Sequence, residues 1–314
     1  AQESRGLGDV YKRQMTISFH HHFRNGDHII NNVLDKLAEM GFKNLTLAAS
    51  SLSAVHAPLI EHIRSGLITH IETSGLRGEL AEQISRGLMD FPVVFRSHGG
   101  RASAIRSGEL HIDVAFLGAP SCDPYGNANG YSRDDDDGIS CGSLGYARTD
   151  AEFADKVIII TNNIVSYPNA PWAIPEHDVD YVVRVDDIGD PKGIMSGATR
   201  YTKDPKELLI AKTAANVVEA AGYLYDGFSM QMGSGGASLA TARFIRQKML
   251  DKGIRCPFAL GGITGQITAM HEEGLIDRIL DVQSFDLDAA KSLKNNHFHH
   301  PVSYTHLRAH ETPE

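Results

Sequence analysis

The stretch FSMQMGSGGASLATARFI (residues 228–245) combines a strand, a glycine loop and a helix. Apolar and polar side chains alternate over residues 228–232, as they do along a strand. Gly233, Gly235 and Gly236 then follow within four positions, and an apolar pattern at helical spacing begins at once. A glycine loop between a strand and a helix presents backbone N–H groups to an anionic ligand, so this unit is typical of an α/β protein.

The segments before this stretch also alternate between helical and strand-like patterns. The predicted helices are 27–40, 57–66, 79–87 and a short one within 100–108, and the predicted strands are 44–50, 67–75, 92–96, 111–118, 156–162 and 181–185. Strands separated by helices of this length predict a mostly parallel sheet that is covered by helices.

A second unit begins near residue 195. Asp204 and Pro205 predict a capped helix start, and that helix extends to Gly222. The later elements are a helix at 237–252, a strand at 257–262, a helix near 265–274 and a strand at 279–284. Their order repeats that of residues 27–78, so we expect two related α/β domains, 15–194 and 195–300, with the second one incomplete.

Both ends of the chain lack helical or strand periodicity. Residues 1–14 and 301–314 resemble translated adapter sequence more than protein, and neither continues the pattern of its neighbour. We therefore expect a non-native extension and a non-native tail around a segment that lacks both native ends.

Composition excludes several function classes. The formal net charge of −9 and the pI near 6.0 offer no basic surface for nucleic acid. No apolar run reaches the roughly 18 residues of a membrane span, and no secretory signal is visible, so we expect a cytoplasmic protein. Cys122, Cys141 and Cys256 form no metal-binding pair. The acidic run at 134–137 is interpreted as a solvated loop, and the histidines at 20–22 are too few for a metal site.

The glycine loop matches neither common nucleotide motif. No Gly-Lys-Ser/Thr follows it, and Ser238 stands where a dinucleotide fingerprint has its third glycine. Two interpretations remain open, namely close strand–helix packing and a backbone cradle for an oxyanion or a pantetheine arm. The cradle would comprise Gly233, Ser234, Gly235 and Gly236, with Gly261 and Gly262 from the next glycine-rich strand end.

Other candidate residues follow predicted strands in the first half. Arg77 and Arg101 each lie beside glycines, and either side chain can grip a carboxylate through two hydrogen bonds. Asp123 and Asn127 belong to a loop dense in turn formers after the strand at 111–118. No nucleophile motif is present, since Ser234 has no recognisable His–Asp partner.

Nine motifs together resemble the citrate lyase alpha subunit family over residues 15–296. They are RNGDH (24–28), TSGLRGELAEQIS (73–85), RSHGGRASAIRSGEL (96–110), FLGAPSCDPYGNANG (116–130), CGSLGYA (141–147), SGATRYTKDPKELLIA (196–211), FSMQMGSGGASLA (228–240), FALGGITG (258–265) and LDVQSFD (280–286). The resemblance implies the CoA-transferase-like (NagB/RpiA-like) fold, with an active site between two related domains.

The resemblance also implies an activity and partners. A citrate CoA-transferase exchanges acetyl for citryl on a CoA-derived thioester arm of an acyl carrier (gamma) subunit, and a beta subunit then cleaves the citryl-thioester. No metal is expected. Many CoA-transferases use a glutamate nucleophile, but FALGGITG contains no acid, so direct transfer between citrate and the acetyl-thioester is the better hypothesis.

Three alternatives remain at this point. A thioester hydrolase or another acyl-CoA:carboxylate transferase would use the same fold. A sugar-phosphate-sensing module would need a basic helix-turn-helix, which the sequence does not contain. The chain is also compatible with an inactive, truncated scaffold that exposes sheet edges.

Overall fold

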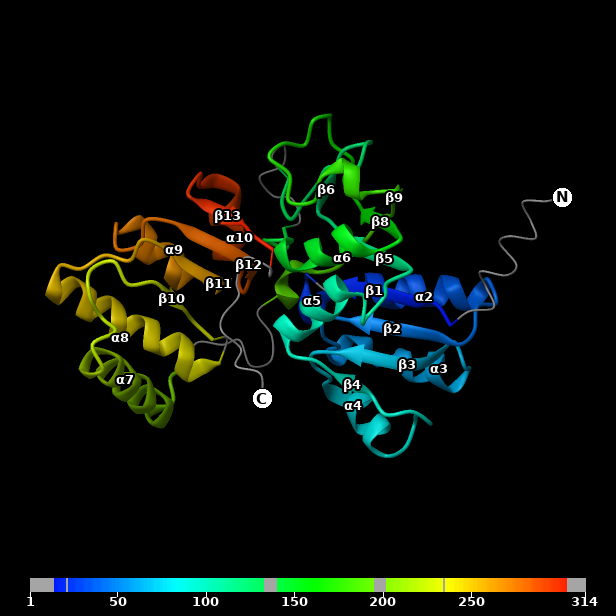
Figure 1. Ribbon diagram of the computed structural model, residues 1–314, viewed down its shortest axis with the longest axis horizontal. Coiled ribbons are helices and arrows are strands. Elements are labelled where there is room, and N and C mark those ends of the chain that lie inside the picture. The colour runs from blue at the N-terminus through cyan, green and yellow to red at the C-terminus, as the bar shows by residue number, and fades with distance from the viewer. Residues whose placement is uncertain (1–13, 21, 133–139, 195–201, 234, 304–314) are drawn as a thin grey trace.

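The computed structural model describes residues 14–20, 22–132, 140–194, 202–233 and 235–303. These residues form a seven-stranded sheet, a four-stranded sheet and a two-stranded hairpin. Every strand pair within the two larger sheets is parallel (Figure 1). The prediction of an α/β fold with mostly parallel sheets is confirmed.

The first sheet has the order β4-β3-β2-β1-β5-β8-β9. Its strands are β1 (Thr16–His20), β2 (Leu45–Ala49), β3 (Ile68–Thr73), β4 (Val94–Phe95), β5 (Val114–Gly118), β8 (Lys156–Thr161) and β9 (Tyr181–Arg184). The chain first builds outward from β1 through β2 and β3 to β4, and then returns to add β5 on the other side of β1. β1 is therefore the point where the direction of strand addition reverses.

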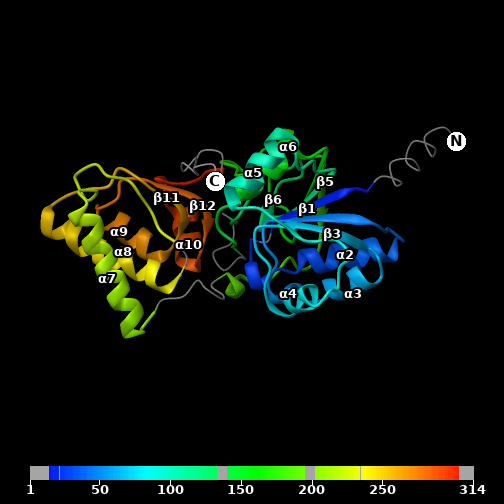
Figure 2. The same ribbon diagram turned by 60° about the horizontal axis from the view of Figure 1, so that its bottom comes forward.

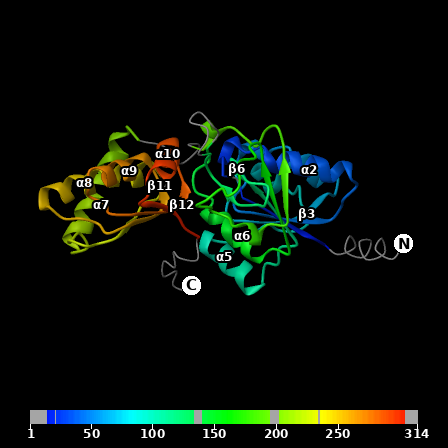
Figure 3. The ribbon, with the colours of Figure 1, turned by 90° about the horizontal axis from the view of Figure 1, so that it is seen from above.

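Helices cover both faces of this sheet. They are α2 (Ile29–Glu39), α3 (Leu59–Arg64), α4 (Gly78–Ser85), α5 (His98–Ser107) and α6 (Arg148–Phe153). α2, α3 and α4 lie on one face, and α5 and α6 lie on the other (Figures 2 and 3). Right-handed crossovers explain this division, because reversing the direction of strand addition moves the connecting helix to the opposite face.

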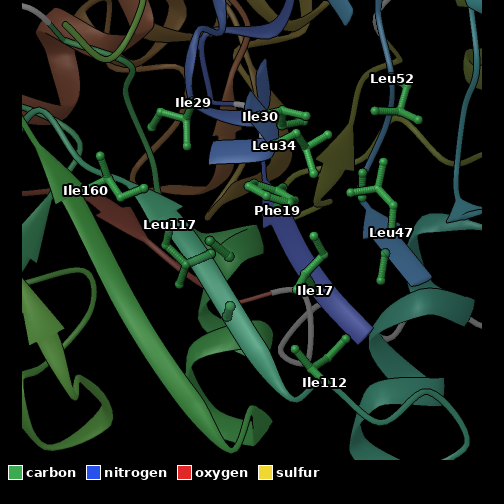
Figure 4. Close-up of a cluster of buried hydrophobic side chains, with 14 of the residues drawn as sticks. Ile17, Phe19, Ile29, Ile30, Leu34, Leu47, Leu52, Ile112, Leu117 and Ile160 are labelled. Atoms are coloured by element: carbon green, nitrogen blue, oxygen red, sulfur yellow. The ribbon is translucent and has the colours of Figure 1, made fainter. Parts of the chain in front are cut away.

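The core of the first unit lies between β1 and its covering helices. Phe19 of β1 packs with Ile30 and Leu34 of α2, and Leu47 and Leu117 extend the cluster along the neighbouring strands (Figure 4). All five side chains are buried. Burial on both faces suits a central parallel strand, whose side chains meet helices above and below.

The second sheet has the order β10-β11-β12-β13. Its strands are β10 (Met230–Gln231), β11 (Ala259–Ile263), β12 (Ile279–Ser284) and β13 (His299–Pro301), and its helices are α7 (Pro205–Ala220), α8 (Gly236–Lys252), α9 (Gly265–Glu272) and α10 (Leu287–Asn295). The predicted cap at the start of α7 is confirmed, since Asp204 Oδ1 accepts a hydrogen bond of 2.8 Å from Lys206 N.

Buried hydrogen bonds join the two units. Ser143 Oγ donates to the Asp281 carbonyl oxygen at 2.6 Å, and Ser143 N donates to Ser284 Oγ at 3.2 Å. Gly142 has a φ of +79°, and a Cβ added there would stand 2.1 Å from Ser284 Oγ. The glycine is therefore needed twice, for its backbone conformation and for the close approach of the two units.

Several elements of the structure were not predicted from the sequence. The hairpin of β6 (Ser121–Cys122) and β7 (Ala128–Asn129), helix α6, helix α10 and strand β13 were not predicted. They are short, so periodicity gives little signal for them. Short 3-10 turns cover Arg24–Gly26, Ala54–His56, Gly145–Ala147, Glu176–Asp178 and Pro191–Gly193. The domain boundary at 194/195 stays a prediction, and the acidic run at 134–137 lies outside the described residues.

Candidate functional site

The candidate site lies where the carboxyl ends of the two sheets approach each other. Parallel strands place all their carboxyl ends at one edge, and open α/β sheets bind ligands there, at the point where strand order reverses. In the first sheet that point is the end of β1, next to β2 and β5. Arg24, which follows β1, stacks on Phe285, which follows β12, with its Cζ 4.4 Å from the ring centroid. This contact links the two carboxyl edges.

A cluster of aromatic and polar side chains occupies the end of β1. The rings of His20 and His22 meet edge to face with centroids 4.2 Å apart, and His20 lies 4.9 Å from the ring of Tyr146. His20 Nδ1 is hydrogen-bonded to Ser50 Oγ, at the end of β2. Tyr146 also packs with Val282 of β12, so the cluster reaches the second unit. The sequence analysis considered the histidines at 20–22 only as metal ligands and gave this group no role.

Arg101 is buried beneath this cluster. Its Nη2 and Nη1 donate to the two carboxylate oxygens of Asp150 at 2.6 and 2.8 Å, and Nη2 also donates to the Ala48 carbonyl oxygen. Burial alone would lower the pKa of Arg101, but the adjacent Asp150 carboxylate outweighs it and raises the pKa above the ordinary value. Direct binding of a substrate carboxylate by Arg101 stays a prediction, and it would require Arg101 to break its hydrogen bonds to Asp150.

Arg77, unlike the buried Arg101, is exposed, and it lies at the start of α4. Burial lowers the pKa of Arg24 to about 10, and the positive charge of Arg77 contributes a smaller part of this shift. Arg24 has a φ of +54°, a backbone conformation that side-chain-bearing residues adopt rarely. Two arginines within electrostatic range at the carboxyl edge form a positive patch. Sequence reasoning found Arg77 and missed Arg24, whose signal was its position directly after the central strand.

Asp123 and Asn127 hold their own loop together. Asp123 Oδ1 accepts hydrogen bonds from the backbone N–H groups of Tyr125, Gly126 and Asn127, and Oδ2 accepts from Asn127 Nδ2 and Asn169 N. Burial raises the pKa of Asp123, but these donors outweigh it, so the pKa lies below its usual value. The contacts agree with a loop-shaping role, and contact with substrate stays a prediction.

The glycine loop leads into the N-terminus of α8. Gly235 is the N-cap residue, and a Cβ added there would meet nothing within 4 Å. Gly236 is more restricted, because a Cβ there would stand 2.6 Å from Glu207 Oε2. Gly233 is exposed, and Ser234 lies outside the described residues. The open space at Gly235 and the unpaired N–H groups expected in the first turn of a helix fit an anionic ligand.

Gly261 and Gly262 have packing reasons of their own. Gly261 has a φ of +102°, and a Cβ at Gly262 would stand 2.0 Å from Phe285 Cε2. The register between β11 and β12 shifts at these two residues. Gly262 lets Phe285 approach the strand end, and a role of Gly261 and Gly262 in binding the thioester stays a prediction.

The described residues contain one group of three possible metal ligands within 4.8 Å of one another. It consists of His111, Asp113 and Asp155, at the amino end of β5 and so at the opposite edge from the candidate site. Exposed acidic groups are common without an ion, and this group carries no argument. Within the described ranges, no helix is long and apolar enough to cross a bilayer.

The family model for the citrate lyase alpha subunit matches residues 5–311. The chain belongs to the citrate lyase alpha subunit family. It is 58% identical over 292 residues to the citrate lyase alpha chain of Haemophilus influenzae and 58% identical over 289 residues to that of Klebsiella pneumoniae. These alignments cover 93% and 92% of this chain but only 58% and 56% of the relatives. The chain thus spans little more than half the length of these family members.

Solved structures agree with this family assignment. A crystal structure described as the alpha subunit of citrate lyase from Streptococcus mutans, in complex with citrate, superimposes with a TM-score of 0.87 at 54% identity, covering 94% of this chain and 58% of that one. The alpha subunit of malonate decarboxylase from Acinetobacter baumannii gives a TM-score of 0.65 at 17% identity, covering 92% of this chain and 52% of that one. At that identity the likeness shows the fold alone, so this chain shares its architecture with that subunit.

Proposed function

We propose that this chain is the citrate CoA-transferase component of a citrate lyase complex. It would convert an acetyl-thioester and citrate to a citryl-thioester and acetate. The observation that carries this proposal is the family match over residues 5–311, together with the citrate-bound state of the Streptococcus mutans relative. The proposal is also supported by the two carboxyl edges that approach each other, one with arginines and the other with glycines. The reaction joins a polyanionic acid, which arginines can bind, to a thioester, whose oxyanion backbone N–H groups can stabilise.

The proposed chemistry is direct transfer. A carboxylate oxygen of citrate attacks the acetyl-thioester carbonyl, the C–S bond breaks, and the thiolate departs. The citrate carboxylate and the acetyl group are then joined in a mixed anhydride. The thiolate then attacks the citryl carbonyl of that anhydride and releases acetate. The protein would supply proximity and stabilisation of the oxyanion rather than a nucleophile. The absence of an acid in residues 258–265 supports this route.

Residue roles follow from position. Backbone N–H groups of Gly233, Gly235 and Gly236 would face the thioester arm or the oxyanion, and Arg77 would bind a citrate carboxylate. The space at Gly235, where an added Cβ would meet nothing within 4 Å, would leave room for the CoA-derived arm. We further propose that the arm belongs to a gamma subunit, that a beta subunit cleaves the product, and that the complex is cytoplasmic.

Mass spectrometry of the chain incubated with acetyl-CoA and citrate tests the activity, with succinate and acid-free controls. Citryl-CoA formed only with citrate is the expected result. Free CoA in every incubation would instead identify a thioester hydrolase. An isolable glutamyl–CoA adduct would contradict direct transfer.

A pair of arginine variants tests the carboxylate-binding role. Arg77→Ala removes a charged hydrogen-bond donor at the start of α4, so the citrate KM should rise roughly tenfold or more. Arg86→Ala at the other end of α4 is the matched control, because Arg86 is also exposed and its nearest acidic partner is Glu82, 3.6 Å away. Equal citrate KM values in the two variants would remove Arg77 from the site.

A further inference from the structure

Arg24 is an arginine of the candidate site to which the proposed chemistry assigns no role. Its φ of +54° lies in the left-handed region, which residues with a side chain adopt rarely. Such conformations persist where the surrounding structure fixes them, and they cluster at ligand-binding sites. The turn of Arg24 is fixed, since Asp190 N donates to the Gly26 carbonyl oxygen at 2.8 Å and a Cβ at Gly26 would stand 2.0 Å from the Asp190 oxygen. The fold therefore maintains an unfavourable conformation at the carboxyl edge.

The loop after β2 holds Arg24 and Arg77 on the same side of the sheet. Asn25 Oδ1 accepts a hydrogen bond of 3.2 Å from Val55 N, and Arg77 N donates to the Leu52 carbonyl oxygen at 3.0 Å. The two arginines follow β1 and β3, which flank β2, so their loops start roughly 10 Å apart. Two long side chains and a small acid between them can span that separation.

The two arginines also act on each other through their charges. Arg77 contributes to the lowered pKa of Arg24, so the two guanidinium groups lie within electrostatic range, and with a pKa of about 10 Arg24 still carries its charge near pH 7. Like charges held close together repel, and a ligand with a negative charge for each of them relieves the repulsion. The pair therefore suits an anion with more than one negative charge.

Phe285 holds the guanidinium of Arg24 from the second unit. The Arg24 Cζ lies over the Phe285 ring, 4.4 Å from its centroid, and Phe285 N donates to the Ile263 carbonyl oxygen at 2.7 Å. Stacking occupies the face of a guanidinium, whereas a carboxylate binds at its N–H edge. Arg24 is only partly buried, so a ligand in solution can reach it.

We propose that Arg24 and Arg77 each bind a different carboxylate of the acceptor acid, so that the chain selects acids with two carboxylates besides the one that reacts. This inference rests on the proposed function, in which one carboxylate of citrate attacks the thioester. Citrate then has two carboxylates left, one for each arginine. Arg24 is thus a specificity-determining residue, and Phe285 is a positioning residue that acts through Arg24.

The test compares citrate with citramalate, which keeps the hydroxyl group and has one carboxylate fewer. Calorimetric Kd values are measured for both acids and for acetyl-CoA with the wild-type chain, Arg24→Gln and Arg24→Lys. The wild-type chain should prefer citrate by roughly tenfold or more, as expected for one hydrogen-bonded charge pair. Arg24→Gln should abolish this preference. Arg24→Lys should keep part of it, because lysine has the charge without the planar fork, and acetyl-CoA should bind all three equally.

Two further variants separate a site role from a structural one. Arg106→Gln is the matched control, because Arg106 also stacks on a phenylalanine, with its Cζ 5.8 Å from the Phe153 ring centroid, but lies in the last turn of α5, which leads to the amino end of β5. It should keep the full preference for citrate. Phe285→Leu should lower the preference severalfold and leave the citramalate Kd unchanged, a split that a general loss of structure would not produce.

Each contrary result has a distinct meaning. An unchanged preference in Arg24→Gln, or equal binding of the two acids by the wild-type chain, would overturn the inference and leave the proposed function intact. A loss of acetyl-CoA binding in place of citrate binding would overturn it as well, by assigning Arg24 to the phosphates of the CoA-derived arm. An unchanged preference in Phe285→Leu would overturn the positioning role. Failure of the wild-type chain to bind citrate at all would overturn both the inference and the proposed function.

Discussion

The carboxyl edges of the two sheets differ in what they are made of. At the first edge, buried polar side chains hold one another, as Arg101 and Asp150 do. At the second edge, glycines allow neighbours to approach the backbone, as Gly262 does for Phe285. The first edge should therefore be sensitive to the loss of a side chain and the second to the gain of one. The first edge is built from paired side chains, and the second is built from backbone that neighbouring side chains approach closely.

The largest effect is expected from Arg101→Ala. It leaves the Asp150 carboxylate buried without its charged partner, and breaking such a pair costs about 3–5 kcal/mol. Urea unfolding monitored by circular dichroism measures the loss. The double variant Arg101→Met/Asp150→Leu should recover much of the stability, because it removes both charges. A single variant as stable as the wild-type chain would contradict the structural role of Arg101 and favour a substrate contact instead.

A smaller loss is expected from Gly262→Ala at the second edge. The added Cβ would stand 2.0 Å from Phe285, and overpacking of this kind costs about 1–3 kcal/mol. Gly235→Ala is the matched control, since a Cβ there meets nothing within 4 Å and the φ of −74° suits any residue. Equal unfolding midpoints for the two variants would show that the second edge tolerates side chains after all.

The contribution of the Asp123 loop to the free energy of unfolding should depend on pH. The folded pKa of Asp123 lies below the ordinary value of 3.8, so between the two values the unfolded chain binds more protons. The stabilisation is present above pH 3.8 and is lost as the pH falls through the folded value. Urea midpoints measured from pH 6 downward should fall more steeply in acid for the wild-type chain than for Asp123→Asn. Parallel curves would argue against a charged Asp123 in the fold.

The smallest effect is expected from Arg246→Ala. Arg246 contacts Glu273 with two hydrogen bonds of 2.6 and 2.8 Å, the same distances as between Arg101 and Asp150, but both side chains are about a third exposed. Exposed pairs contribute about 0–1 kcal/mol. A loss as large as that of Arg101→Ala would mean that burial does not separate the two pairs. Salt should weaken the Arg246 effect and leave the Arg101 effect almost unchanged.

Much of the fold can be predicted from the sequence, because the patterns that favour helices and strands act over a few neighbouring residues. The periodicity of residues 27–40 and the cap at Asp204 act within a few residues, and the structure confirms both elements. The long motifs likewise identify the family without any structure. Short elements such as β13 cannot be predicted in this way, because its three residues form a strand only by pairing with β12, which is formed by another part of the chain.

The candidate site depends on contacts that no local pattern contains. Arg77 and Arg101 look alike in the sequence, yet one is exposed and the other is bound to Asp150, 49 residues away. Arg24 meets Phe285 only because two sheets face each other, and His22 lacks partners only because the fold encloses it. The α/β alternation and the family could both be predicted from local sequence patterns. Which charged groups are paired and which buried polar atoms have no partner follows only from the folded chain, because desolvation and pairing depend on neighbours that are distant along the sequence.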